Sequence, residues 1–332
     1  MEYQWSNNTS QTYRLMDAYS GDSTPYLFAI DYESQESFVI PHPEEQKEIL
    51  FAVEGYNNMQ PDVHISDIEP VWSTKPEPFS VYSRRFRRIH DALLRGDSFL
   101  ANLTIATPIS LNLSLHDVFY RSCAPYRLYV PGRFVCFSPE KFVTIDEQGV
   151  ISTYPMKGTI DATLPDASDL ILNNYKETAE HSTIVDLMRN DLNQVADEVR
   201  LVKFRYLDRL ETINGPILQM SSCISGKVMP GFQGKLGSLI SRLLPAGSIS
   251  GAPKEATVRA IQEAEDRKRG FYSGVFGYYD GSRLYSAVMI RFIEQESDGS
   301  LLFRSGGGIT INSKVEDEYR ETQQKVYLSL KK

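Results

Sequence analysis

Two segments of the sequence each carry a pair of glutamates at a spacing that places both side chains on one face of a helix. In "NYKETAEHSTIVDLMRNDL" these are Glu177 and Glu180, and in "EDEYRETQQK" they are Glu318 and Glu321, with Lys325 one turn further on. Side chains at i and i+3 are neighbours on a helix surface. A single pair is most often a solvated helix face, but two facing helices with such pairs can bind a divalent cation. Mg²⁺ suits such a site, because it takes one or two carboxylates together with an anionic substrate.

The first of these helices has an apolar side close to its glutamates. His181 shares the face of Glu177 and Glu180, and the apolar residues between 184 and 188 continue near it. Carboxylates close to a core-facing surface are costly unless a positive charge meets them. The sequence has no cluster of histidines and cysteines next to these glutamates, which argues against zinc.

A run of glycines, "SGGGIT", precedes the second acidic helix. The backbone N–H groups of Gly306, Gly307 and Gly308 are free of side-chain crowding and can hold an anion such as a carboxylate or phosphate. Glycine at the end of a strand is often only a bulge, so this pattern is weak alone. A second glycine-containing stretch, "GSISGAPKEATVRA", lacks the Gly-Lys-Ser/Thr of a nucleotide-binding loop, and we interpret it as the entry to a helix.

Lys157 lies in "YPMKGT", directly after the alternating run "VISTY". A lysine at a loop tip is usually a surface charge. The other interpretation is a reactive amine held inside a site, which must be neutral to act. At a reference pKa of about 10.4, roughly one lysine in a thousand is neutral near pH 7.4. Burial, a nearby metal ion and neighbouring cations would all lower the pKa of this amine.

Composition restricts the class of protein. The chain has 332 residues, 41% hydrophobic and 23% charged, with a net charge of −8. An acidic chain of this kind is not expected to bind nucleic acid or anionic membranes. Its three cysteines show no C-x-x-C spacing, its N-terminus does not resemble a signal peptide, and no apolar run approaches the roughly 18 residues of a membrane span. We therefore expect a cytoplasmic enzyme or binding protein.

The elements that must position these residues are strands in hairpins, interrupted by helical blocks. Hairpins are predicted for "YLFAIDY…SFVI", "RLYVPGRFVCF" and "KFVTIDEQGVIST". Residues 271–311 are predicted to form three long strands joined by two Asp-Gly turns. No crossover helices separate these strands, so an α+β fold with large antiparallel sheets is expected rather than a doubly wound parallel sheet.

Two helices can be placed from periodicity. In "SRRFRRIHDALLRGD" the apolar stripe is expected to contain Phe86, Ile89, Leu93 and Leu94, while the four arginines between 84 and 88 form a solvated face. A single long helix is predicted from about Ala167 to Leu192.

Five ordered blocks resemble the chorismate-utilising enzymes: "YPMKGT", "AEHSTIVDLMRNDL", "GSISGAPK", "RGFYSGVFGYYD" and "SGGGIT…EDEYRETQQK". This family includes anthranilate synthase component I, aminodeoxychorismate synthase component I, and the isochorismate and salicylate synthases. The resemblance covers roughly residues 80–330. It implies one catalytic domain over residues 1–332, with a shortened N-terminal part up to about residue 80. The implied fold is two large antiparallel β-sheets packed face to face with helices outside.

The resemblance also implies roles for individual residues. Glu180 and Glu318 would be the principal Mg²⁺ ligands, with Glu177 and Glu321 acting through water. Glu140, in "FSPEKF", would be the general acid that protonates the departing C4 hydroxyl of chorismate, since hydroxide leaves far more easily as water. The positions that would hold the substrate are Thr159, Tyr272, Arg291, Gly307, Gly308 and Lys325.

Three positions bear on which reaction is catalysed. In the family, "PMKGT" resembles the aminodeoxychorismate synthase subgroup, and anthranilate-type members carry alanine at the position of Lys157. Leu100 stands where members that add water carry a lysine base, so isochorismate and salicylate synthesis are disfavoured. Gln219-Met220 replaces a family His-Leu pair whose histidine is implicated where pyruvate is eliminated. Anthranilate synthesis is thereby disfavoured too, although it remains the main alternative.

The expected reaction is therefore that of aminodeoxychorismate synthase component I, from chorismate and ammonia to 4-amino-4-deoxychorismate in p-aminobenzoate and folate synthesis. Lys157 would attack C2 of chorismate and ammonia would then enter at C4. A lysine that only hydrogen-bonds the substrate is the simpler role. No cysteine here lies in a nucleophile-elbow context, so a glutamine amidotransferase partner is implied as the ammonia source. A non-catalytic protein that binds chorismate is a further alternative, in which these groups would be idle.

Overall fold

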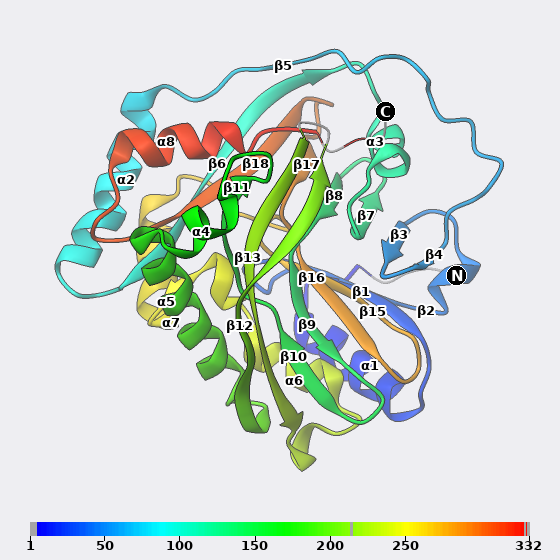
Figure 1. The fold of residues 1–332 in the computed structure, drawn as a ribbon. Coiled ribbons are helices and arrows are strands. Elements are labelled where there is room, and N and C mark those ends of the chain that lie inside the picture. Colours follow the sequence, from blue (N-terminus) through cyan, green and yellow to red (C-terminus); the bar gives the residue numbers. More distant parts are fainter. Residues whose placement is uncertain (1–4, 213–214, 329, 331–332) are drawn as a thin grey trace.

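The computed structural model describes residues 5–212, 215–328 and 330. Within these ranges the strands form two nine-stranded sheets in which neighbouring strands are antiparallel. Figure 1 shows the two sheets packed against each other, with the helices outside them. The predicted α+β class and the pair of antiparallel sheets are confirmed.

The first sheet has the strand order β11-β13-β10-β9-β16-β15-β1-β2, and β12 pairs with β13 outside this path. Its strands are β1 (Tyr26–Ile30), β2 (Ser37–Pro41), β9 (Lys141–Ile145), β10 (Val150–Thr153), β11 (Met156–Asp161), β12 (Ala196–Thr212), β13 (Gly215–Val228), β15 (Val275–Tyr279) and β16 (Leu284–Val288). The β1–β2 and β9–β10 hairpins are those expected from their alternating residues and turns.

The second sheet has the order β14-β6-β18-β17-β8-β7-β3-β4, and β5 pairs with β6. Its strands are β3 (Leu50–Val53), β4 (Tyr56–Asn57), β5 (Trp72–Thr74), β6 (Leu100–Leu111), β7 (Tyr126–Val130), β8 (Phe134–Ser138), β14 (Gly251–Ala252), β17 (Phe292–Gln295) and β18 (Leu301–Ile309). The glycine run lies in β18, where Gly306, Gly307 and Gly308 pair with residues 102–104 of β6.

Helices cover the outer surfaces of the sheets (Figure 1). They are α1 (Thr9–Gly21), α2 (Phe79–Leu94), α3 (Leu115–Arg121), α4 (Ala167–Leu172), α5 (Tyr175–Leu192), α6 (Leu236–Leu243), α7 (Lys254–Ala264) and α8 (Val315–Gln324), with short 3₁₀ turns η1 (Pro43–Glu45), η2 (Pro230–Phe232) and η3 (Gly247–Ile249). No helix among the described residues is both long enough and apolar enough to cross a bilayer.

Apolar residues from both sheets meet between them. Phe38 and Phe276 of the first sheet and Phe51, Phe134 and Phe292 of the second belong to one buried cluster. Aromatic pairs span the contact, with ring centroids 5.3 Å apart for Phe51 and Tyr278. Each aromatic ring buries a large apolar area, so this interior layer holds the sheets face to face.

The predicted long strand over residues 282–296 is in fact two strands in different sheets. β16 ends at Val288, β17 begins at Phe292, and Arg291 between them has φ +54°. The alternation of apolar residues continues through this point, so periodicity alone predicted one strand. The chain leaves the first sheet here and enters the second.

The predicted helix over residues 167–192 is also divided. α4 ends at Leu172 and α5 begins at Tyr175, with Asn174 as its N-cap accepting from the Glu177 N–H at 3.1 Å. Asparagine is a strong N-cap residue, and two asparagines in succession were the signal for this break.

Two side chains in α2 differ from expectation. Phe86, Ile89 and Leu93 are buried as predicted, but Leu94 is 60% exposed at the helix end. Arg85 was assigned to a solvated face, yet it is buried and forms an ion pair with Glu77. The helix packs on α7 as well as β6, so a wider part of its surface is covered than a single apolar stripe requires.

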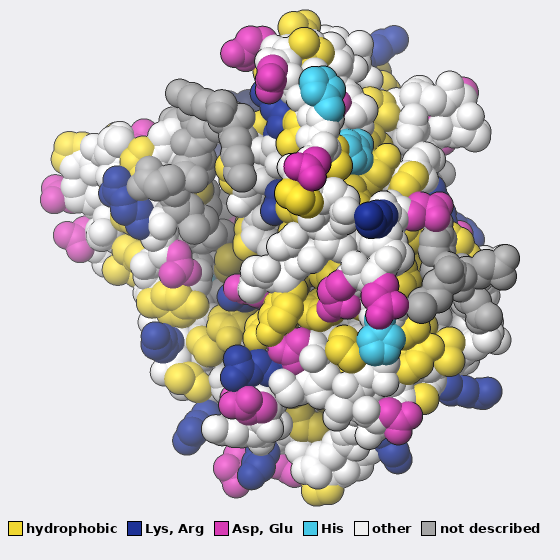
Figure 2. All heavy atoms as spheres, turned by 90° about the vertical axis from the view of Figure 1, so that its right-hand side faces the viewer, with side chains coloured by type: hydrophobic (Ala, Val, Ile, Leu, Met, Phe, Trp, Pro, Cys, Tyr) yellow, Lys and Arg dark blue, Asp and Glu magenta, His cyan; other side chains and the backbone are white. Residues whose placement is uncertain are grey.

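The side of the molecule that carries both termini is shown in Figure 2. On the described part of this face, lysines and arginines are scattered singly among acidic and apolar side chains. A continuous basic stripe, which nucleic acid would require, is not present on that part.

A buried ion pair joins the elements behind the glycine run. Arg269 is 1% exposed and donates to both carboxylate oxygens of Glu265, at 2.8 and 2.9 Å. It also donates to the carbonyls of Ile249 and Asn102, and Glu265 accepts from the Thr104 N–H at 2.9 Å. The pair therefore links α7, η3 and β6.

Replacement of Arg269 by methionine should destabilise the protein by about 3–5 kcal/mol, because Glu265 would remain buried without its partner. The free energy of unfolding from denaturant titration would measure this. The matched control is Arg95→Met, which removes an exposed ion pair with Asp97 and should leave stability nearly unchanged. Equal effects of the two substitutions would contradict the structural role of Arg269.

Candidate functional site

The first acidic pair lies on the N-terminal half of α5. The helix buries Ile184 and Met188 in the core, which fixes its rotation and leaves Glu177 and Glu180 on the side of β11. Glutamate in the first turn of a helix is favoured by the helix dipole. His181, expected on the same face, is fully buried and contacts the Ser222 hydroxyl at 2.7 Å. Burial, together with Arg205 and Lys157, lowers the pKa of His181 to about 4, so it is neutral near pH 7.

The second acidic pair lies on α8. Glu318 is 2% exposed and accepts a hydrogen bond of 2.7 Å from the Ser313 hydroxyl. Glu321 forms an ion pair of 2.7 Å with Lys325, and the Lys325 ammonium also donates to the Gly306 carbonyl at 3.0 Å. Burial lowers the pKa of Lys325, with Glu321 opposing this effect. The contacts of Ser313 and Lys325 hold α8 against the glycine run of β18.

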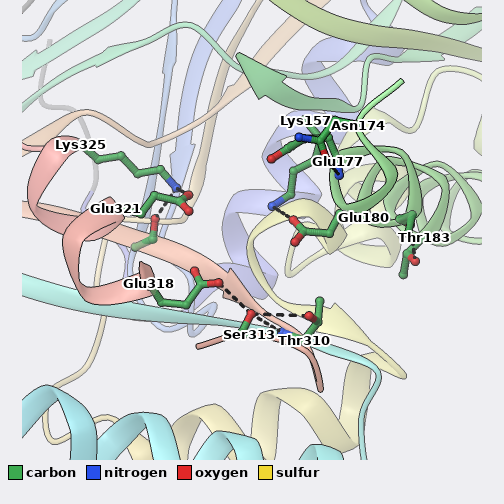
Figure 3. Close-up of polar contacts among 12 residues, drawn as sticks. Lys157, Asn174, Glu177, Glu180, Thr183, Thr310, Ser313, Glu318, Glu321 and Lys325 are labelled. Carbon is green, nitrogen blue, oxygen red and sulfur yellow. Dashed lines mark hydrogen bonds and ion pairs between the residues drawn. The ribbon is translucent and has the colours of Figure 1, made fainter. Parts of the chain in front are cut away.

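The glycine run lies between the two acidic pairs. A Cβ added to Gly307 would lie 3.5 Å from Glu318 Oε2 and 3.9 Å from Lys325 Nζ. A Cβ added to Gly308 would lie 3.4 Å from Lys157 Nζ. In Figure 3 the glutamates of α5 and those of α8 approach this strand from opposite sides. Glycine thus provides the space around which the charged groups gather, as its position in the sequence suggested.

Lys157 is not a surface charge. Its side chain is 23% exposed, and Nζ lies 3.0 Å from Glu180 Oε2. Burial lowers the pKa of Lys157, but the attraction of Glu180, Glu321 and Glu177 outweighs burial and raises it above the usual value. The expectation of a lowered pKa is therefore wrong for this arrangement, in which the carboxylates are the nearest charges.

The irregularity in β11 after Lys157 requires glycine. Gly158 has φ +80°, and a Cβ there would lie 2.9 Å from Glu177 Oε2. A larger residue would be strained and would displace that carboxylate. Thr159, which follows, is exposed and in register with Gln219 of β13.

Glu140 follows β8 and faces the η3 turn. The Ser248 hydroxyl donates to Glu140 Oε1 at 2.5 Å. Burial raises the pKa of Glu140, and Ser248, Arg291, Lys157 and Lys325 only partly offset this. A carboxyl with a raised pKa holds a proton at higher pH than an exposed one, which suits a proton donor.

Arg291 and Tyr272 flank the passage between the sheets. The Arg291 guanidinium lies over the Tyr327 ring at 5.0 Å, and its Nε is buried without a hydrogen-bond partner among the described residues. Tyr272 packs on Phe292, and burial raises its pKa to about 12. An unpaired buried guanidinium nitrogen is costly, so this group is suited to an anionic ligand.

By donor type, the acidic pairs suit a hard divalent cation, because every predicted ligand atom is a carboxylate oxygen. Gly307 also leaves space beside Glu318. In the described residues, however, no three acidic, histidine or cysteine side chains are already gathered around one point. Two of the four glutamates pair with lysines instead. The residues fit the metal by type, while Glu180 and Glu321 are at present held by cationic side chains and Glu318 by the Ser313 hydroxyl.

Two site residues were missed from the sequence. Ser248 lies within "GSISGAPK", which was interpreted as a helix entry and as one of the blocks that carry the family resemblance, and Ser313 lies in the loop before α8. The Ser248 hydroxyl holds a carboxylate 108 residues away, and Ser313 holds one only five residues ahead; neither contact follows a periodic pattern, so the three-dimensional structure was needed to find them.

Comparison with known proteins identifies a matching family model and similar curated proteins. A family model described as chorismate binding enzyme matches residues 10–331. An uncharacterized PabA-like protein of Haemophilus influenzae is 49% identical, with 94% of each chain covered. Aminodeoxychorismate synthase component 1 of Bacillus subtilis is 28% identical over 92% of this chain and 70% of its own.

A solved structure has the same fold. Anthranilate synthase component I of Streptococcus pneumoniae superposes with a TM-score of 0.69 and 23% identity, covering 90% of this chain and 79% of that one. At this identity the likeness concerns the fold alone. From the family match over nearly its whole length, the chain belongs to the chorismate binding enzymes.

Proposed function

We propose that this protein is an aminodeoxychorismate synthase component I, which converts chorismate and ammonia to 4-amino-4-deoxychorismate. The observation that carries the proposal is the position of Lys157. Its amine lies 3.0 Å from Glu180 and faces Gly308 of the glycine run. A lysine at this point is within reach of a ligand bound between the acidic pairs.

The reaction proceeds in two displacements. The neutral Lys157 amine forms a bond to C2 of chorismate, the ring double bonds shift, and the C4–O bond breaks. Glu140 gives its proton to the departing hydroxyl, which leaves as water. Ammonia then forms a bond to C4, the double bonds shift back, and the C2–N bond breaks, which releases the neutral lysine amine. The new C4 ammonium group returns a proton to the Glu140 carboxylate. Covalent catalysis of this kind replaces one difficult step with two easier ones.

The lysine must first become neutral. Its hydrogen bond to Glu180 favours the ammonium form, so that contact has to be given up before attack. Lys325 and Arg291, the neighbouring cations, then disfavour a second positive charge and favour loss of the proton.

Substrate orientation comes from cations and backbone on several elements. Arg291 and Lys325 would hold one carboxylate of chorismate, supported by the N–H groups of Gly307 and Gly308, with Tyr272 and Thr159 as further contacts. Holding the chorismate carboxylate in place orients the ring before the reaction, which lowers the entropic part of the activation barrier. The ring would then present its C4 hydroxyl to Glu140.

Mg²⁺ would be held by Glu180 and Glu318, with Glu177 and Glu321 acting through water. When bound, it supplies positive charge that neutralises and anchors the other carboxylate of the substrate. The oxygen-only donor set supports this choice.

Leu100 supports amination over hydration. It is 3% exposed, and its Cδ1 lies 3.2 Å from the position of a Cβ on Gly308. An apolar side chain at this point cannot take a proton from water. Ammonia would come from a glutamine amidotransferase partner, which the PabA-like name of the 49% identical relative favours.

The alternative is anthranilate synthase component I, which would eliminate pyruvate. The presence of Lys157 and of Gln219 in place of the family histidine favours the aminated product. Incubation with chorismate, Mg²⁺ and an ammonium salt, followed by mass identification of the product, tests the proposal. Fluorescent anthranilate would establish the alternative, and binding of chorismate without turnover would indicate a non-catalytic role.

Glu180→Ala and Glu318→Ala should each abolish Mg²⁺-dependent turnover while the fold stays intact. Each removes an oxygen donor from one side of the proposed metal site. Calorimetric titration with Mg²⁺ in the presence of a chorismate analogue checks this, and Glu147→Ala, on an exposed turn, is the control. Unchanged metal affinity in both variants would rule out the ligand assignment.

Glu140→Gln should lower kcat by about 10²–10⁴, the usual contribution of a positioned general acid. Chorismate affinity should change little, since the proposed anion contacts lie on other residues. Steady-state kinetics and equilibrium binding separate the two effects. If kcat stays near that of the native enzyme, another group is the acid.

Lys157→Ala should lose most activity, and quenched turnover mixtures of the native enzyme should contain protein heavier by chorismate less water on the peptide bearing Lys157. Lys157→Arg should not restore activity, because a guanidinium stays protonated and cannot attack. Peptide mass spectrometry and initial rates measure both.

The control is Arg283→Ala, since Arg283 also pairs with a glutamate, Glu147 at 3.2 Å, and both side chains are exposed. An arginine variant nearly as active as the native enzyme would mean that Lys157 is an electrostatic contact rather than the nucleophile.

A further inference from the structure

The η3 turn connects Glu140 to the far end of α5. Ser248 of this turn donates to Glu140 Oε1 at 2.5 Å, and Glu140 is otherwise held by its own backbone, whose N–H donates to the Ser138 hydroxyl at 3.0 Å. The position of the carboxyl group therefore depends on where the turn places the Ser248 hydroxyl. The turn itself is only three residues long, so it needs support from outside.

Asp191 supplies that support from the last turn of α5. Its carboxylate lies against the backbone of Gly247, whose N–H lowers the pKa of Asp191, and a Cβ on Gly247 would lie only 2.7 Å from Asp191 Oδ2. The same Cβ would contact Leu187 at 3.1 Å. No side chain fits between the turn and the helix, so the backbone of η3 lies directly on α5.

Lys254 makes this arrangement stable. Its ammonium lies 2.9 Å from Asp191 Oδ1, with side chains 21% and 13% exposed, and donates to the Leu243 carbonyl at 3.0 Å. A carboxylate at the C-terminal end of a helix is disfavoured by the helix dipole. Burial raises the pKa of Asp191, and Lys254 and the Gly247 N–H oppose that rise. The ion pair keeps Asp191 available as an acceptor for the turn.

We propose that Asp191 is a positioning residue for the general acid, acting through Gly247 and Ser248 to hold the Glu140 carboxyl in place. This inference rests on the proposed role of Glu140 as the acid. It gives α5 two tasks, since Glu177 and Glu180 at one end bind the metal and Asp191 at the other end sets the proton donor.

The consequence for pH follows from the groups that face Glu140. These are Ser248 on η3, Arg291 between β16 and β17, Lys157 on β11 and Lys325 after α8, all of which lower the pKa of Glu140 against the effect of burial. Loss of the Ser248 contact removes one lowering influence, so the pKa of Glu140 rises. The acid works only while protonated, so the alkaline limb of the kcat profile moves to higher pH.

The test is the pH profile of Asp191→Asn. We expect kcat to fall by as much as about 100-fold, the cost of a small misplacement of a reacting group, with KM nearly unchanged and the alkaline limb shifted upward. Because Lys254 would remain half-buried without its partner, the double variant Asp191→Leu/Lys254→Met is measured as well. Ser248→Ala should shift the limb in the same direction, and Ser248→Thr should restore it.

Asp186→Asn is the matched control, since Asp186 lies on the exposed side of the same helix. A double-mutant cycle with Glu140→Gln isolates the coupling. Asp191→Asn should have little further effect once Glu140 is glutamine. The positioning role is wrong if Glu140→Gln is strongly impaired and adding Asp191→Asn lowers kcat further by the same factor as in the native enzyme. It is also wrong if Asp191→Asn alone leaves the alkaline limb of the kcat profile unmoved. If Glu140→Gln keeps a near-native kcat, the proposed acid itself is wrong.

Discussion

One stretch of chain, residues 284–295, supplies a strand to each sheet, and the geometry of the site depends on this passage. β16 pairs with β15 and β9 in the first sheet, and β17 pairs with β18 and β8 in the second. Only Met289–Arg291 separate them, so the sheets cannot slide past one another without breaking one of these ladders. Arg291 lies at the passage, and β18, the partner of β17, carries the glycine run. The groups proposed to bind the substrate anion are therefore fixed by the same constraint that joins the two sheets.

Charge balance decides the arrangement of the side chains around that passage. Two helices bring four glutamates close to a strand, and such a concentration of carboxylates is unfavourable unless cations accompany it. Lys157 and Lys325 meet Glu180 and Glu321, and Ser313 holds Glu318. The lysines serve as internal counter-ions here, which explains why the amine proposed as the nucleophile is found as an ammonium group paired with a proposed metal ligand.

Much of the fold was predictable because the local sequence patterns agree with the strands and turns that the three-dimensional structure contains. Alternating apolar residues and Pro-Gly or Asp-Gly turns predicted the hairpins, and the i, i+3 glutamates with nearby glycines predicted which segments gather at the site. The failures share a cause. The strand over residues 282–296 keeps its alternation across a change of sheet, and only the pairing partners reveal the break. Arg85 contacts Glu77 and the Thr104 carbonyl of β6 rather than water, and one apolar stripe does not encode such contacts with distant segments. Ser248 reaches Glu140 from a segment 108 residues away, a contact for which single-sequence reasoning has no signal.

Backbone strain is concentrated beside the proposed substrate contacts. Ser273 has φ +66° and Arg291 has φ +54°, and both flank Met289, whose carbonyl accepts from the Ser273 N–H and whose N–H donates to the Gly274 carbonyl. A non-glycine residue in this region costs about 1–3 kcal/mol. Glycine at position 291 would relieve that cost and remove the guanidinium. Arginine at this position therefore costs backbone stability and places a guanidinium at the proposed substrate contact, an exchange of stability for function of the kind found at binding sites.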